Sequence, residues 1–270
     1  MEPNPGAPRP KLPLWRTVGC AYRAVFSNLG VLLRIAWPWL LIMVPFQVAY
    51  YWWAWPTMQC PDIDAPTPPT DITQSLTSSL WCLAMTLPWS GIAVGWHRFL
   101  LRGETSSAFP PRRGHPFVPY VGVAVLFGFM TILPFLIADL VPFSNSDEMP
   151  TALVVAMGIF CVLLLVISRL SVCLPAIAIE GPGRTLGEAW RATRGNTWRL
   201  MAGSLLAGMP VIAFAIIEVV VAQVTGRLSF TLAGAVLGPV NLLLIAVGVG
   251  FLSYSWRHFY DDGPTTHATA

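Results

Sequence analysis

Few residues of this 270-residue chain have the types and spacing that catalysis or metal binding requires. The segment Leu87-Pro-Trp-Ser-Gly91 comes nearest to a nucleophile elbow, but it lacks the first glycine of GxSxG. The four histidines, His97, His115, His258 and His267, are not spaced as ligands on one helix face. We therefore predict no enzymatic activity, no metal site and no cofactor, and we place His97 and His258 in the membrane interface.

Arginine is the residue type through which this chain could bind a ligand. The candidate contacts for a lipid headgroup or a protein partner are Arg16, Arg23, Arg98, Arg169, Arg184, Arg191, Arg194 and Arg257. Such side chains snorkel to lipid phosphates by default, and a specific pocket for an anionic lipid is the alternative. We expect Arg191 to matter most, because Arg23 repeats it at the same place on a helix.

Three polar residues could form a site inside the bilayer, namely Asp139, Glu218 and Asn241. An intramembrane carboxylate is normally a functional candidate. Both acids, however, fall near the outer ends of apolar segments, where interfacial water is within reach. A binding or proton-coupled site therefore competes with simple interfacial placement.

The composition points to an all-α polytopic membrane protein. The chain is 55% hydrophobic and only 11% charged, with a mean hydropathy of +0.62. A bilayer core about 30 Å thick requires roughly 20 apolar residues in a helix. Six segments have that length: residues 35–55, 75–96, 116–138, 149–168, 200–224 and 228–256. The net charge of +3 belongs to the membrane flanks and does not indicate nucleic acid.

The basic residues predict the orientation. With six spans, all of the 16 basic residues except Arg227 fall on one side. Since Lys and Arg are retained on the cytoplasmic side, both termini are expected in the cytoplasm.

An internal repeat links residues 16–28 and 184–196, which share seven of 13 positions. Each copy predicts a short amphipathic helix in the cytoplasmic interface, with arginines on its wet face. Thr185 and Glu188 form a predicted capping box at the start of the second copy. We expect the two helices to superpose and to lie against the inner ends of the hairpins that they introduce.

The predicted organisation is a Pro-rich disordered tail at 1–13, a single six-span membrane domain at 14–260 and a disordered tail at 261–270. The six spans would form three hairpins, although only two of them carry the repeat.

Three stretches, residues 96–104, 169–180 and 186–196, carry a resemblance to a known group of proteins. They resemble the YciC-type bacterial six-span proteins and the membrane domain attached to some glycerophosphoryl diester phosphodiesterases. The resemblance covers residues 14–260 and implies fold and location more than activity, because the chain has no room for the phosphodiesterase domain. It implies no catalytic residues.

These observations predict a non-enzymatic protein of the bacterial inner membrane, acting as a lipid-associated or partner-binding module. The expected partners are membrane lipids, with anionic headgroups foremost; a protein partner is not specified. The alternative is a small transporter for an amphiphilic solute, and a membrane enzyme ranks third. A polar cavity at mid-bilayer would favour the transporter.

Overall fold

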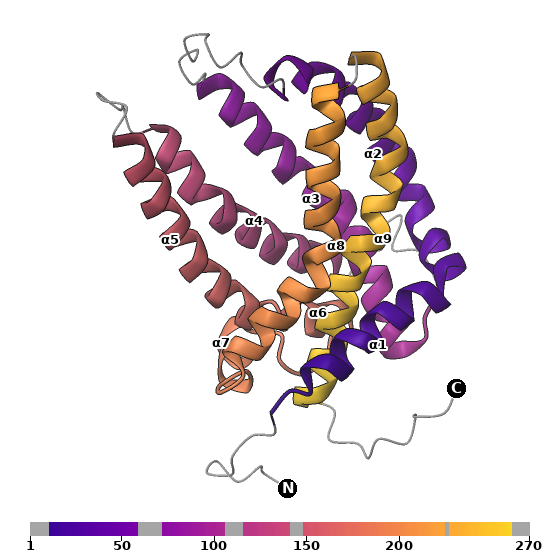
Figure 1. Cartoon of the computed structure of the whole chain (residues 1–270). Coiled ribbons are helices and arrows are strands. Elements are labelled where there is room, and N and C mark those ends of the chain that lie inside the picture. Colours follow the sequence, from indigo (N-terminus) through magenta and orange to yellow (C-terminus); the bar gives the residue numbers. More distant parts are fainter. Residues whose placement is uncertain (1–10, 59–71, 106–115, 141–147, 225–226, 261–270) are drawn as a thin grey trace, which may run out of the picture.

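The computed structural model describes residues 11–58, 72–105, 116–140, 148–224 and 227–260. All regular structure in these residues is helical (Figure 1). A helix satisfies its backbone polar groups within its own segment, which is what an apolar chain in lipid requires. The all-α class predicted from the sequence is therefore confirmed.

Six long helices coincide with the six apolar segments. They are α2 (Leu29–Met58), α3 (Ile72–Arg102), α4 (Phe117–Leu140), α5 (Glu148–Leu170), α8 (Thr197–Val224) and α9 (Arg227–Tyr260). Within the described residues, four of them (α2, α4, α5 and α8) are long and apolar enough to cross a membrane.

Three short helices lie at one end of the molecule, the lower end in Figure 1. They are α1 (Leu14–Ser27), α6 (Cys173–Ala178) and α7 (Leu186–Ala192). The repeat predicted α1 and α7. It did not predict α6, every residue of which is buried.

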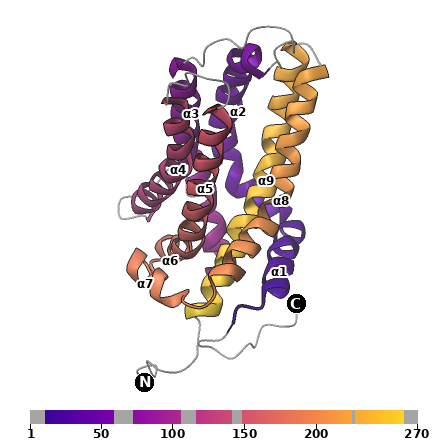
Figure 2. The same cartoon turned by 60° about the vertical axis from the view of Figure 1, so that its left-hand side comes forward.

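Helix α9 forms the centre of the packing, with α1, α2, α3 and α8 against it (Figures 1 and 2). The helices α2 and α3, α4 and α5, and α8 and α9 also pack on each other as consecutive pairs. Fully buried side chains at the core include Leu32, Ile35, Trp96, Leu200 and Phe251. Large apolar side chains on the outer faces of α5 and α8 are exposed, as expected for a surface in contact with lipid.

The small residues of α3 allow a close approach of α2. A Cβ atom on Gly91 would overlap the ring of Trp39, and one on Gly95 would meet the side chain of Ile35. These two glycines, four residues apart, therefore serve the packing of helices within the chain.

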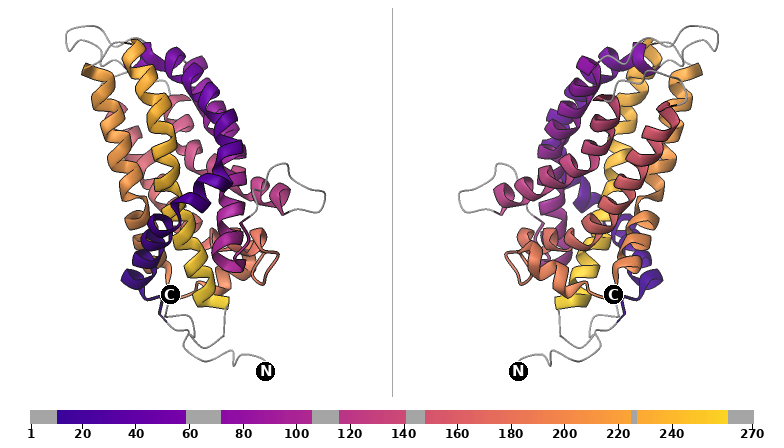
Figure 3. Two further views of the ribbon diagram at one scale, coloured as in Figure 1. Left: turned by 90° about the vertical axis from the view of Figure 1, so that its right-hand side faces the viewer. Right: turned by 90° about the vertical axis from the view of Figure 1, so that its left-hand side faces the viewer.

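The expected placement of the repeat helices is wrong in one respect. Both are helical and both lie at the same end of the molecule, but neither lies against the pair that it introduces. Helix α1 lies across α8 and α9 (Figure 3, left), and α7 lies on α5 and α6. Helix α7 thus packs on α5, which precedes it in the chain, whereas α1 packs on the last pair, α8 and α9. The turn at the end of each copy directs the next long helix away from the repeat helix.

Candidate functional site

The two repeat copies end in the same turn. The backbone N–H of Asn28 donates to the carbonyl of Val25 at 3.2 Å, and that of Asn196 donates to Thr193 at 3.0 Å. The carbonyl of each asparagine then accepts from the residue four places on, at 3.0 Å and 2.9 Å, which starts the next long helix. The repeat therefore encodes a helix followed by a redirecting turn.

The two copies also bury the same face. Ala21 and its counterpart Ala189 are fully buried, and Ala24 and Ala192 are 7% and 5% exposed. The arginines at matching positions, Arg16 with Arg184 and Arg23 with Arg191, are all exposed. The face that carries these arginines is therefore exposed in both copies, and its contact with water at the interface stays a prediction.

The capping box predicted at the start of the second copy is present. The Thr185 hydroxyl accepts from the backbone N–H of Glu188 at 3.2 Å, and the Glu188 carboxylate accepts from the backbone N–H of Thr185 at 3.3 Å. The first copy has Cys20 in place of the glutamate, and the N-cap of α1 is Pro13 with no side-chain hydrogen bond. Helix α1 therefore lacks the capping box that starts the second copy.

The candidates Arg98 and Arg257 both donate hydrogen bonds to backbone carbonyls of other helices, and Arg102 acts beside Arg98. Arg98 forms a salt bridge with Glu104 at 2.7 Å and donates to the carbonyl of Ala178 at 3.3 Å. Arg102 donates to the next carbonyl, that of Ile179. The two arginines thereby neutralise the carbonyl end of α6, where a cation is favourable. Arg257 donates to the carbonyl of Leu100 at 3.3 Å and ties α9 to α3.

A third candidate, Arg169, covers the aromatic side chain of the second repeat copy. Its guanidinium carbon lies 3.5 Å from the ring centroid of Trp190, which is a cation–π contact. It also donates to Thr193 Oγ1 at 3.2 Å and to the carbonyl of Trp190. Backbone carbonyls thus engage Arg98, Arg169 and Arg257, and the ring of Trp190 also engages Arg169. The expected contact of these side chains with lipid phosphate stays a prediction.

The remaining candidates stay on the surface. All five of them are exposed, namely Arg16, Arg23, Arg184, Arg191 and Arg194. They lie in or next to α1 and α7 at the lower end of the molecule in Figure 1, which we call the arginine-rich end. We call these five the exposed arginines. They give this end of the molecule a positive surface.

The chain before α1 is anchored beside these arginines. The backbone N–H of Leu12 donates to Asn196 Oδ1 at 2.8 Å, and its carbonyl accepts from Arg199 Nη1 at 2.7 Å. The Leu12 side chain is fully buried. Leu12, which the predicted tail includes, is thus held against the start of α8.

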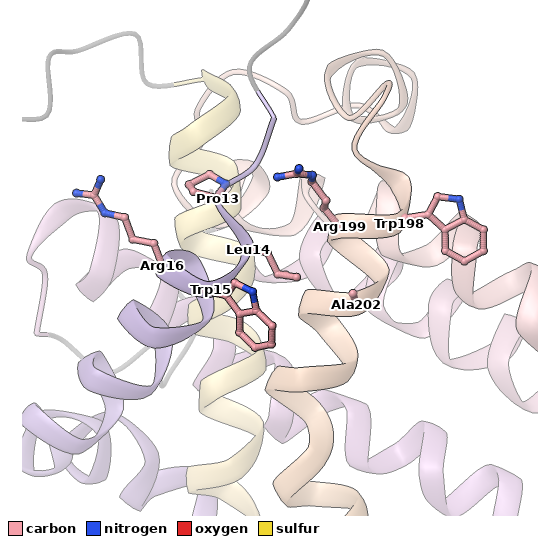
Figure 4. Close-up of a pocket in the computed structure, with 7 residues that line it drawn as sticks. All are labelled: Pro13, Leu14, Trp15, Arg16, Trp198, Arg199 and Ala202. Carbon is pink, nitrogen blue, oxygen red and sulfur yellow. The ribbon is translucent and has the colours of Figure 1, made fainter.

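A groove of about 560 Å³ lies between the start of α1 and the start of α8 (Figure 4). Its lining residues are Pro13, Leu14, Trp15, Arg16, Trp198, Arg199 and Ala202. The guanidinium groups of Arg16 and Arg199 lie at the level of Pro13, and the indole of Trp15 reaches down between the helices. Trp15 and Trp198 are 75% and 69% exposed. Tryptophan is enriched at the membrane–water interface, so two exposed tryptophans are typical of a groove at that interface.

Helix α1 is held on α8 just below the groove. The hydroxyl of Tyr22 donates to the carbonyl of Leu206 at 3.0 Å. Burial raises the pKa of this phenol, so it stays protonated and able to donate at neutral pH.

The histidine expected in the interface is a core residue. His97 is fully buried, with Nδ1 2.7 Å from Ser253 Oγ and Nε2 3.2 Å from the hydroxyl of Tyr120. The Ser253 hydroxyl already donates to the carbonyl of Val249 at 3.1 Å. It must therefore accept from Nδ1–H of His97, which leaves Nε2 to accept from Tyr120. These three side chains, the His97 cluster, join α3, α4 and α9. No sequence signal indicated it, because its members are far apart in the chain.

Of the three residues predicted as an intramembrane polar site, the structure describes the side chain of Asn241 alone. Asp139 and Glu218 fall in α4 and α8, but their side chains lie outside the described residues. Asn241 lies in α9, and its buried Oδ1 accepts no hydrogen bond from the described part of the chain. In that same part, no group of three His, Cys, Asp or Glu side chains could hold a metal ion.

Comparisons with known proteins add no relative, because no protein-family model, curated protein or solved structure matches the chain.

Proposed function

We propose that this chain is a non-enzymatic protein of the bacterial inner membrane whose arginine-rich end associates with anionic phospholipids. Its six long helices would all cross the membrane as three hairpins, with both termini in the cytoplasm. The resemblance to the YciC-type proteins is consistent with this proposal and remains a prediction.

The observation that carries the proposal is the gathering of the exposed arginines at one end of the molecule. The repeat helices α1 and α7 carry three of them, Arg16, Arg23 and Arg191. Both helices bury their alanine faces on other helices, while these arginines stay exposed. A basic residue near an anionic membrane surface gains about 1 kcal/mol from the surface potential. Four arginines at matching places in two copies therefore favour anionic over zwitterionic headgroups.

The consecutive helix pairs support the hairpin arrangement. The pairs α2–α3, α4–α5 and α8–α9 each pack together, and the His97 cluster takes one residue from each pair. A buried polar cluster shared by three hairpins would hold them in a defined arrangement.

Electron paramagnetic resonance with spin-labelled lipids tests the proposal. Purified protein in mixed bilayers should immobilise phosphatidylglycerol in preference to phosphatidylcholine with the same chains. The preference should be about fivefold for a gain of about 1 kcal/mol, and it should fall at high salt. Replacing Arg23, Arg184 and Arg191 together by Gln should reduce it, whereas Arg227→Gln should not. Equal immobilisation of the two lipids by the unaltered protein would refute the proposal.

A further inference from the structure

The groove between α1 and α8 is lined by two cationic side chains, Arg16 and Arg199. Within the described residues, neither Arg16 nor Arg199 forms a salt bridge with a carboxylate. Arg199 uses Nη1 to hold the carbonyl of Leu12, which positions its guanidinium at the mouth of the groove. The other N–H groups of a guanidinium lie in a fixed plane with the one that is bound. The mouth of the groove is therefore suited to an oxyanion such as a phosphate.

The floor of the groove continues into an apolar track. Ala202 lines the groove, and Leu205, Met209, Ile212 and Ile216 follow it along α8, exposed by 44%, 54%, 47% and 60%. The steps of three and four residues keep these side chains on one face of the helix. At about 1.5 Å per residue, the track from Ala202 to Ile216 extends about 21 Å, more than one leaflet of a core about 30 Å thick.

The two exposed indoles mark the level at which headgroup and acyl chain meet. Figure 4 shows the guanidinium of Arg199 toward the end of the molecule, the indole of Trp198 on the side of α8 away from α1, and the indole of Trp15 at the level of Ala202, where the apolar track begins. An anionic phospholipid has this order of an anionic group, an interfacial region and a long apolar chain.

We propose that the α1–α8 groove binds one anionic phospholipid of the surrounding leaflet. Its phosphate lies against Arg199, Arg16 supplies a second positive charge at the rim, and one acyl chain follows the track on α8. This inference rests on the proposed function and goes further, because it assigns a stoichiometric site in place of a general surface preference.

Native mass spectrometry of protein released from nanodiscs tests the site. The nanodiscs contain phosphatidylglycerol and phosphatidylcholine with identical chains. The unaltered protein should retain one phosphatidylglycerol at collision energies that remove all other lipids. Arg16→Gln and Ala202→Phe, which fills the floor of the groove, should each reduce this retained species at least several-fold. Arg227→Gln, at the opposite end of the α8–α9 pair, is the control and should keep it.

The outcomes separate the site from the general function. If Ala202→Phe and Arg16→Gln both keep the retained lipid while the preference for immobilised phosphatidylglycerol persists, the groove is not the site and the proposed function stands. If the unaltered protein retains no anionic lipid and shows no preference, both fail. A millimolar excess of soluble glycerol phosphate should not displace the lipid; displacement would show that the groove recognises free phosphate and would overturn the assignment. Thermal unfolding of each variant in detergent should match that of the unaltered protein, because Arg16 is exposed and Ala202 borders open space.

Discussion

Nδ1 of His97 lies 2.7 Å from Oγ of Ser253, and this hydrogen bond joins α3 to α9 across 156 residues of chain. Both side chains are fully buried. The Ser253 hydroxyl also donates to the carbonyl of Val249, so the imidazole completes a network that leaves the serine oxygen satisfied.

Removing that hydroxyl should destabilise the junction of the three helix pairs. Ser253→Ala leaves Nδ1–H of His97 buried without its acceptor, which costs about 1–3 kcal/mol in the free energy of unfolding. Thermal unfolding in detergent measures the change. Ser27→Ala, at the exposed end of α1, is the control and should change little. An unaltered stability for Ser253→Ala would mean that the His97 cluster does not hold the helices together.

The contact of α1 with α8 and α9 depends on Gly203. A Cβ atom at this position would overlap the ring of Phe251 and lie 3.0 Å from Leu14 Cδ1. Gly203→Ala should therefore lower stability by about 1–3 kcal/mol through overpacking.

Gly208, five residues further along α8, provides the matched control. A Cβ atom there would meet nothing within 4 Å, and alanine is the better helix former, so Gly208→Ala should be neutral or slightly stabilising. Equal loss of stability in the two variants would show that α1 does not press on α8 at this point.

Helix α7 has only seven residues, so its cap should decide whether it stays folded. Thr185→Ala removes the acceptor for the N–H of Glu188 and should cost about 0.5–2 kcal/mol locally. Hydrogen exchange of residues 186–192 should become faster. Thr185→Asp supplies another cap and should restore protection; if it does not, the cap is not the cause.

Arg191 and Arg23 should matter more to lipid association than the two acids near the outer end. Arg191→Gln and Arg23→Gln should each lower the amount of co-purified anionic lipid, because both arginines are exposed at the same end. Asp139→Asn and Glu218→Gln should leave it unaltered. If the arginine variants behave as the unaltered protein while an acid variant abolishes a solute flux, the transporter replaces the lipid-associated module.

The sequence predicted what local chemistry and hydropathy determine. Thr185 and Glu188 cap their helix as expected, because a capping box involves residues three apart. The six apolar segments became the six long helices, because each is long enough to pack or cross as one element. The repeat predicted which faces are buried, as Ala21 and Ala189 show.

Contacts between distant segments escaped prediction. His97 was expected in the interface, since nothing near it in the chain announces Tyr120 and Ser253 as its partners. For Arg98 and Arg169 the sequence indicated only contact with lipid. Their contacts with the buried helix α6 and with Trp190 follow from tertiary packing, which the local sequence does not reveal. The groove was missed for the same reason, as Trp15 and Trp198 belong to helices brought together only by the fold.

The proposed association with lipid requires that the arginine-rich end face the cytoplasmic leaflet, and site-directed labelling tests this requirement most directly. Single cysteines at Ser146 and Thr266, in a variant whose native cysteines are replaced, are exposed to a membrane-impermeant maleimide in spheroplasts of a bacterial host. If the arginine-rich end faces the cytoplasm, the reporter at 146 reacts at once and the reporter at 266 reacts only after the membrane is permeabilised. The reverse order would place the arginines on the outer side and contradict the account.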